Sequence, residues 1–410
     1  MRRWRSCRPP SVRPQPEPEP TTLDRDCALE RLVQWWEKKM LPNNNFWRRR
    51  CGLNSLWLVS WPIIFTLFGG WQVEGNLVIT AAFDSTITGD PNAAVIEGTI
   101  NSVIALYEAS FSDPVTVTIN FQEMAGGLGQ NSSYFIPGVP YSTFRAMLAA
   151  AATTANDTNA LANLPAGGAN PVNGSSTIAL NLPNGRALGF SGSDWDPPPG
   201  QTDGIVYLNT SSMNLDRTSI NRSKFDLFAV VAHEIDEVLG LTSALDGLAN
   251  GDPAPTGDVQ VMDLFRYDQN GNRSFNTAIG SQAWFSLDGT TRLVRFSQDA
   301  TGDFHDWYSP GGQTPRVQDA FATPGATPNP TVELLALDVI GYHLLVPTIA
   351  ITRAGNGKET VSWSPNTPGF VLQERTNLLS ATWLNSASGT NNPVTITNTG
   401  TIKFFRVFHP

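Results

Sequence analysis

The chain has 410 residues, of which 40% are hydrophobic and 15% charged, and its formal net charge is −9. This length exceeds that of one ordinary domain, and the composition excludes a mainly disordered chain. Only 7 of the 36 acidic residues but 12 of the 27 basic ones lie in 1–75, so 76–410 carries a net charge of −14 and should repel nucleic acid and anionic membranes.

Residues 1–75 are predicted to be an N-terminal extension and a signal peptide. Three arginines at 48–50 precede an apolar run at about 53–70, and Gly75 closes a tolerable cleavage site. A basic stretch, an apolar stretch and small residues in this order are typical of an export signal. We therefore expect a secreted or cell-surface product that meets the membrane only through this segment before cleavage. An uncleaved anchor is the alternative, and Met40 competes with Met1 as the true start.

Residues 76–345 are predicted to form one α+β domain with a mixed sheet. Short apolar or alternating runs indicate strands, and longer runs with apolar residues at helical spacing indicate helices. The strands are expected near 77–83, 114–121, 177–182 and 205–208, and the helices near 92–111, 142–154 and 331–340. A hairpin is expected over 282–296, with its turn at Asp288-Gly289.

The strongest helix prediction covers 224–239, within the sequence NRSKFDLFAVVAHEIDEVLGL. Ser223 and Asp226 match a capping box, and Gly240 is a plausible stop. An apolar stripe runs along the segment at helical spacing, made of Phe225, Phe228, Val231, Ile235, Val238 and Leu239. The segment is therefore expected to pack one face against the core and to hold its polar residues in fixed positions.

The composition changes again at Pro347. From 347 to 410, alternating segments separated by turn residues predict five or six strands in a short length. That pattern is typical of a small β-sandwich, so we expect a separate C-terminal module. Such a module could bind a cell surface or a polysaccharide.

The helix at 224–239 carries the residues of a candidate metal site. All three cysteines lie within the first 51 residues, so a metal site elsewhere must use histidines and carboxylates. His233 and Glu237 are four residues apart and share one helix face, where both can reach one zinc ion. Glu234, next to His233, is the candidate general base. The alternative is that His233 and Glu237 are a simple pair on an ordinary helix, because four-residue motifs arise often by chance.

The sequence AHEIDEVLG resembles the HEISEVMG helix of a group of exported bacterial metzincin-like metalloproteases. Further segments between about Phe83 and His343 are similar to segments of that group in the same order, among them VMDLFRYDQNGNRSF, AWFSLDGTTRLVRFSQDATGDFHDW and LLALDVIGYHL. The resemblance implies a zincin-like fold, with a backing helix and an active-site helix, and zinc as cofactor. Glu237 stands where the metzincin pattern has its second histidine. Met262 could be the methionine beneath the metal, and the alternative is that it is an ordinary core residue.

The third zinc ligand stays open between three residues. The metzincin position for it falls on Ser243, a poor ligand for zinc. Asp246, His305 and His343 are the candidates, and His305 is preferred because Asp303 and Asp306 could orient its imidazole. An exposed histidine with no ligand role is the alternative for His305.

Together these features predict a secreted zinc-dependent metallopeptidase of residues 76–345 that acts on protein or peptide substrates. His233, Glu237 and His305 are the predicted metal ligands, and Glu234 is the predicted catalytic residue that activates a metal-bound water. The alternative is a non-catalytic secreted protein, for adhesion or carbohydrate binding, on a degenerate zincin scaffold. The departures at Glu237 and Ser243 support that alternative.

Overall fold

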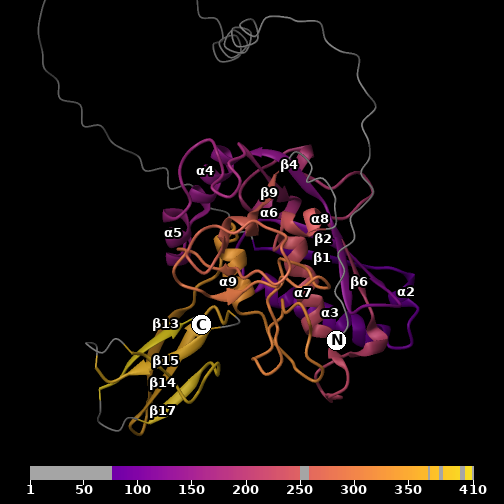
Figure 1. Cartoon of the computed structure of the whole chain (residues 1–410). Helices are drawn as coiled ribbons and strands as arrows, with labels where there is room; N and C mark the ends of the chain where they lie inside the picture. The colour runs from indigo at the N-terminus through magenta and orange to yellow at the C-terminus, as the bar shows by residue number, and fades with distance from the viewer. Residues whose placement is uncertain (1–75, 250–257, 368–369, 378–381, 398–401, 409–410) are drawn as a thin grey trace, which may run out of the picture. The chain divides into compact units, whose positions relative to one another are not determined.

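The computed structural model describes residues 76–249, 258–367, 370–377, 382–397 and 402–408 (Figure 1). The predicted extension and signal peptide, 1–75, lie outside the described residues. Among the helices that are described, none is both long enough and apolar enough to span a membrane.

A four-stranded mixed sheet organises the first part of the domain. Its strand order is β1-β2-β6-β3, formed by Val78–Phe83, Thr116–Glu123, Gly204–Leu208 and Gly129–Ser133. The first three strands run parallel, whereas β3 runs antiparallel to β6 at the edge. The prediction of a mixed sheet is confirmed, although β3 itself was not predicted, because its sequence GQNSS has no apolar alternation.

Two long helices pack against each other and against this sheet. Helix α3 spans Ala93–Glu108 and contacts β1, and α7 spans Leu227–Leu239 and contacts β3 and β6 (Figure 1). Both bury apolar residues at helical spacing, Ile96, Ile100 and Val103 among them. Helix α7 is buried over almost its whole length, so its polar residues are also shielded from solvent.

The ends of α7 explain where its polar residues are placed. The helix starts later than predicted, because Asp226 is its N-cap and accepts a hydrogen bond from the Ala229 amide, while Ser223 donates to Asn221 instead. It ends at Gly240, whose φ of +130° is a conformation that other residues rarely adopt. A side chain there would also press on Asn184, 3.1 Å from the position of a Cβ.

The other elements of 76–345 are shorter. Helix α9 and the hairpin β11-β12 confirm the predicted last helix and hairpin. The helices are α2 (Ser85–Thr88), α4 (Tyr141–Ala151), α5 (Ala155–Ala162), α6 (Leu182–Ala187), α8 (Ala244–Ala249) and α9 (Val332–Val339). The strands are β4 (Phe135–Pro140), β5 (Thr177–Asn181), β7 (Met213–Asn214), β8 (Phe225–Asp226), β9 (Val259–Gln260), β10 (Arg266–Tyr267), β11 (Trp284–Phe285) and β12 (Val294–Arg295).

The C-terminal residues form two small antiparallel sheets with three strands each. One has the order β13-β14-β17 and the other β16-β15-β18. The strands are Thr348–Gly355, Lys358–Ser364, Val371–Arg375, Leu384–Asn385, Val394–Thr397 and Phe404–Phe408, numbered β13 to β18 in chain order. Val361, Trp363 and Leu372 make a small apolar cluster to which both sheets contribute. The prediction of five or six strands here is confirmed, whereas their packing as a β-sandwich and their independence as a module stay predictions.

Candidate metal centre

Four side chains from two distant parts of the chain converge on one buried point. His233 and Glu237 come from α7, and His305 and Asp306 come from the loop that follows β12. His233 Nε2 lies 3.1 Å from Glu237 Oε1 and 3.3 Å from Asp306 Oδ1. His305 Nε2 lies 2.7 Å from Glu237 Oε1 and 3.7 Å from Asp306 Oδ1. The structure thus brings together the three residues that the sequence suggested as ligands, and adds Asp306.

Both imidazoles are fixed by a hydrogen bond on the side away from this cluster. His233 Nδ1 lies 3.0 Å from the carbonyl oxygen of Val317, which can only accept, so the ring donates from Nδ1. His305 Nδ1 lies 2.7 Å from Asp246 Oδ2. Each ring therefore turns Nε2 toward Glu237, and an acceptor behind a histidine that fixes its tautomer is typical of metal ligands.

Four residues proposed from sequence have roles in the structure that differ from the proposed ones. Asp246, an alternative third ligand, instead holds His305 and the Phe304 amide, the latter at 2.5 Å. The expected orienting role of Asp303 and Asp306 is therefore wrong, because Asp246 performs it. His343 pairs with Asp113 at 2.6 Å and belongs to neither group of side chains that could hold a metal among the described residues.

Three further expectations can be compared with the structure. His305 is only 3% exposed, so the alternative of a surface histidine is wrong. Ser243 donates to Asp263 at 2.5 Å and takes no part in the cluster, in agreement with its poor ligand chemistry. Met262 is buried in a short helical turn, Val261–Phe265. Burial is expected both for a methionine beneath the metal and for an ordinary core residue, so it does not distinguish the two.

Two amides that sequence reasoning missed hold the carboxylates in place. Asn131, on β3, donates to Glu234 Oε2 at 3.2 Å and contacts Glu237 Oε2. Gln318 donates to Glu237 Oε1 at 3.3 Å and to Asp306 Oδ1 at 3.0 Å. Neither residue lies in a recognisable motif, and each is far from α7 in sequence, so no local signal could have identified them.

The pKa values of these groups show how strongly they act on one another. Burial would raise the pKa of Glu237, but His305 and His233 lower it to about 2. Burial would lower the pKa of His233, yet Asp306 and Glu237 raise it well above its usual value. The imidazoles and the carboxylates therefore stabilise one another's charged forms, and a metal ion would compete with protons for the same Nε2 atoms.

Glu234 differs from Glu237 in this respect. Its burial and the neighbouring Glu237 carboxylate hold its pKa well above the usual value. A glutamate with a raised pKa is suited to accept and return a proton near neutral pH. The two glutamates of the HExxE motif therefore have opposite electrostatic environments, although they lie on the same helix.

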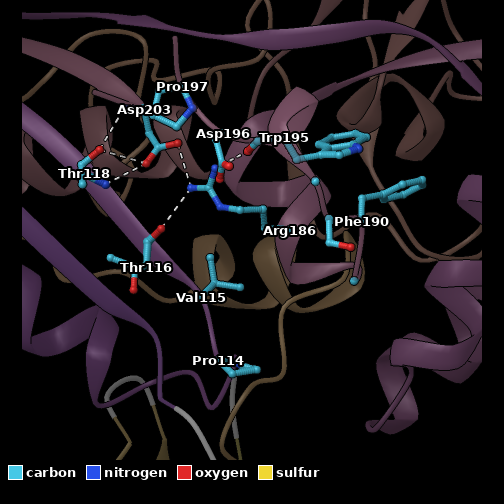
Figure 2. Close-up of a pocket in the computed structure, with 13 residues that line it drawn as sticks. Pro114, Val115, Thr116, Thr118, Arg186, Phe190, Trp195, Asp196, Pro197 and Asp203 are labelled. Atoms are coloured by element: carbon cyan, nitrogen blue, oxygen red, sulfur yellow. Dashed lines mark hydrogen bonds and ion pairs between the residues drawn. The ribbon is translucent and has the colours of Figure 1, made fainter. Parts of the chain in front are cut away.

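A pocket elsewhere among the described residues is a different feature. It has a volume of about 520 Å³ and is shown in Figure 2. Arg186 crosses it, donating to the Trp195 and Thr116 carbonyls and pairing with Asp203 at 2.7 Å (Figure 2). None of the residues of the metal cluster lines this pocket. The guanidinium of Arg186 is already bonded within the protein. The pocket therefore plays no part in the buried metal cluster.

Comparisons of the chain with protein-family models, with curated proteins and with solved structures found no match.

Proposed function

We propose that the chain is an exported zinc-dependent metallopeptidase whose metal is held by His233, Glu237 and His305. The observation that carries the proposal is the convergence of both Nε2 atoms on Glu237, with Glu234 beside them on the same helix. Nitrogen and carboxylate donors of this kind are typical ligands of zinc. The resemblance of the HExxE helix to metzincin-like proteases and the mixed sheet beside it support a zincin-like fold.

The donor atoms fit a zinc ion by their spacing as well as by their chemistry. Two ligands at about 2.0 Å from a tetrahedral ion are roughly 3.3 Å apart. The distances from the two Nε2 atoms to Glu237 Oε1 and Asp306 Oδ1 range from 2.7 to 3.7 Å. In addition, Asp306 Oδ2 is buried without a hydrogen-bond partner among the described residues, as expected for a carboxylate that binds a cation.

The residues of the chain would share the work of peptide hydrolysis in the following way. Zinc, when bound, supplies a Lewis acid that polarises the scissile carbonyl and makes water more acidic. Glu234 takes a proton from the attacking water and then passes it to the leaving amine. Asn131 bonds the Glu234 carboxylate and so holds it in place for both transfers. Val317 and Asp246 keep both imidazoles in the ligating tautomer.

The wider proposal concerns location and partners. The predicted signal segment supports export, and the substrate would be a protein or peptide. The C-terminal sheets are proposed to bind a cell surface or a polysaccharide, a role that small β-modules of secreted proteins often have. The negative charge of 76–410 argues against nucleic acid as a partner.

A second candidate function has a specific observation in its favour. Asp306 supplies a fourth donor at 3.3 Å from His233 Nε2, and His233, Glu237, His305 and Asp306 are all at most 3% exposed. Zinc sites with four protein ligands are usually structural, whereas catalytic ones keep an open position. A non-catalytic secreted protein on a degenerate zincin scaffold would have a closed site of this kind.

Two variants of the HExxE helix distinguish these functions. Glu234→Gln should keep its zinc and lose about 10²–10⁴-fold in peptidase turnover, because it removes a positioned general base. Glu237→Ala should lose the metal itself. Glu97→Gln, a half-buried glutamate on α3, is the matched control and should change neither quantity. Full zinc in Glu237→Ala would show that the carboxylate is not a ligand. Unchanged hydrolysis in both helix variants, or none in the parent, would favour the non-catalytic scaffold.

A further inference from the structure

The metal cluster has more donors than one zinc ion needs. Besides His233, Glu237, His305 and Asp306, the carboxylate of Asp303 also points toward the group. The side chains form two sets of three whose ligand atoms lie within 4.8 Å of one another: His233, Glu237 and Asp306, and Glu237, Asp303 and His305. Glu237 is the one residue that the two sets share. Each set has one imidazole and one aspartate of its own.

The charge of the cluster also exceeds what one ion neutralises. Four carboxylates lie together here besides Glu234, those of Glu237, Asp246, Asp303 and Asp306, and they carry a formal charge of −4 when ionised. Ligating imidazoles are neutral and add nothing to this sum. One divalent cation would leave −2, and a second would leave no net charge. Since uncompensated charge in a buried place is costly, the sum favours two cations.

Each set of three has one aspartate of its own, and the two aspartates differ in burial. Asp306 is fully buried, and its Oδ2 has no partner within the described part of the chain. A buried carboxylate oxygen normally has a donor or a cation next to it, so Asp306 is an acceptor that a cation would satisfy. Asp303 is half-buried and adds the carboxylate of the second set, next to His305 and Glu237.

We propose that the centre binds two divalent cations, one held by His233, Glu237 and Asp306 and the other by Glu237, Asp303 and His305, with Glu237 as the bridging ligand. The inference rests on the proposed function, because it divides that site between two ions. Two ions also account for the fourth donor, Asp306, which would leave a single zinc ion with no open position. Each ion then has three protein ligands, which leaves the open position that a catalytic metal requires. Paired ions of this kind are used by several classes of hydrolase, aminopeptidases among them.

The test is the number of ions bound per chain. The full chain is loaded with Zn²⁺ or Co²⁺, and excess metal is removed. Its metal content is then measured by inductively coupled plasma mass spectrometry, and the number of ions on the intact protein by native mass spectrometry. Two ions are expected in the parent and one in Asp303→Asn. Asp299→Asn replaces an exposed aspartate of the same loop and should keep two. Circular dichroism and a thermal melt establish that each variant is folded.

Cobalt provides a second readout that does not depend on activity. Two Co²⁺ ions bridged by one carboxylate are magnetically coupled, so the parent should give an attenuated electron paramagnetic resonance signal. Asp303→Asn should give the full signal of an isolated ion.

The outcomes separate this inference from the proposed function. One ion in the parent would overturn the two-ion site and leave the zinc peptidase standing. No ion in the parent would overturn both. Two ions in a folded Asp303→Asn would show that Asp303 is not a ligand and would overturn the assignment of the second site.

Discussion

The clearest prediction concerns Asp246, which contacts no metal in either proposed site but holds the ligand His305. Its Oδ2 accepts from His305 Nδ1 at 2.7 Å, and its Oδ1 accepts from the Phe304 amide at 2.5 Å. In Asp246→Asn one of these two oxygens becomes an NH₂ group, so one donor loses its acceptor. A hydrogen bond to a charged group contributes about 1.5–3 kcal/mol. If the loss falls on His305, zinc binding should weaken by roughly 10–100-fold, which corresponds to about 1.4–2.8 kcal/mol.

The assay is a competitive zinc titration against a chromophoric chelator, which gives the dissociation constant of each variant. Asp299→Asn is the matched control, because it makes the same chemical change on an exposed residue of the neighbouring loop. Asp246→Ala removes both acceptors, so a folded Asp246→Ala protein that binds zinc within about threefold of the parent would refute the argument. It would mean that His305 needs no orienting partner or is not a ligand, since such partners ordinarily matter by at least tenfold.

Three further predictions concern other parts of the chain. Burial and the nearby Asp157 raise the pKa of Asp338 to about 8, so the folded state favours the protonated form. The contribution of this group to the free energy of unfolding is therefore fully present below about pH 4 and is lost as the pH rises to about 8. Asp338→Asn should therefore unfold at a higher temperature than the parent at pH 8 and show a flatter dependence of stability on pH; an unchanged dependence in thermal melts would contradict this. A chain ending at Leu345 should keep one cooperative unfolding transition and the activity of the whole chain, and loss of that transition would show that the C-terminal sheets complete the core. Material recovered outside the cytoplasm should begin near Asn76, and peptide mapping that finds residues 1–39 in it would disprove the predicted cleavage.

Local patterns predicted the parts of the fold that local interactions determine. The apolar stripe and Gly240 defined α7, and the Asp288-Gly289 turn defined the hairpin that places the following loop. The HExxE spacing placed His233 and Glu237 on one helix face, and the structure shows them 3.1 Å apart. His305 was preferred because it lies among acidic residues. The structure places it beside Glu237, with Asp246 as the partner that orients its ring, and its role as a ligand stays a prediction.

The remaining residues of the centre depend on contacts between distant segments. Asn131 reaches Glu237 from a polar edge strand, 106 residues away in sequence, and Gln318 reaches it from 81 residues away. Asp306 was predicted to orient the imidazole of His305, whereas its carboxylate lies 3.3 Å from His233 Nε2. Adjacent residues of an irregular loop can face in any direction. Such a loop has no period from which side-chain direction can be read. Only the packing of the loop against α7 turns Asp306 toward His233.

The central claim is that α7 and the loop at 303–306 hold a metal between them. Its most direct test is anomalous diffraction at the zinc absorption edge, from crystals of the zinc-loaded full chain. We expect an anomalous peak about 2.0–2.2 Å from both His233 Nε2 and a Glu237 oxygen, and no peak there in crystals of Glu237→Ala. Stoichiometric zinc with no peak at that position, or with its peak at another site such as His343 and Asp113, would contradict the claim.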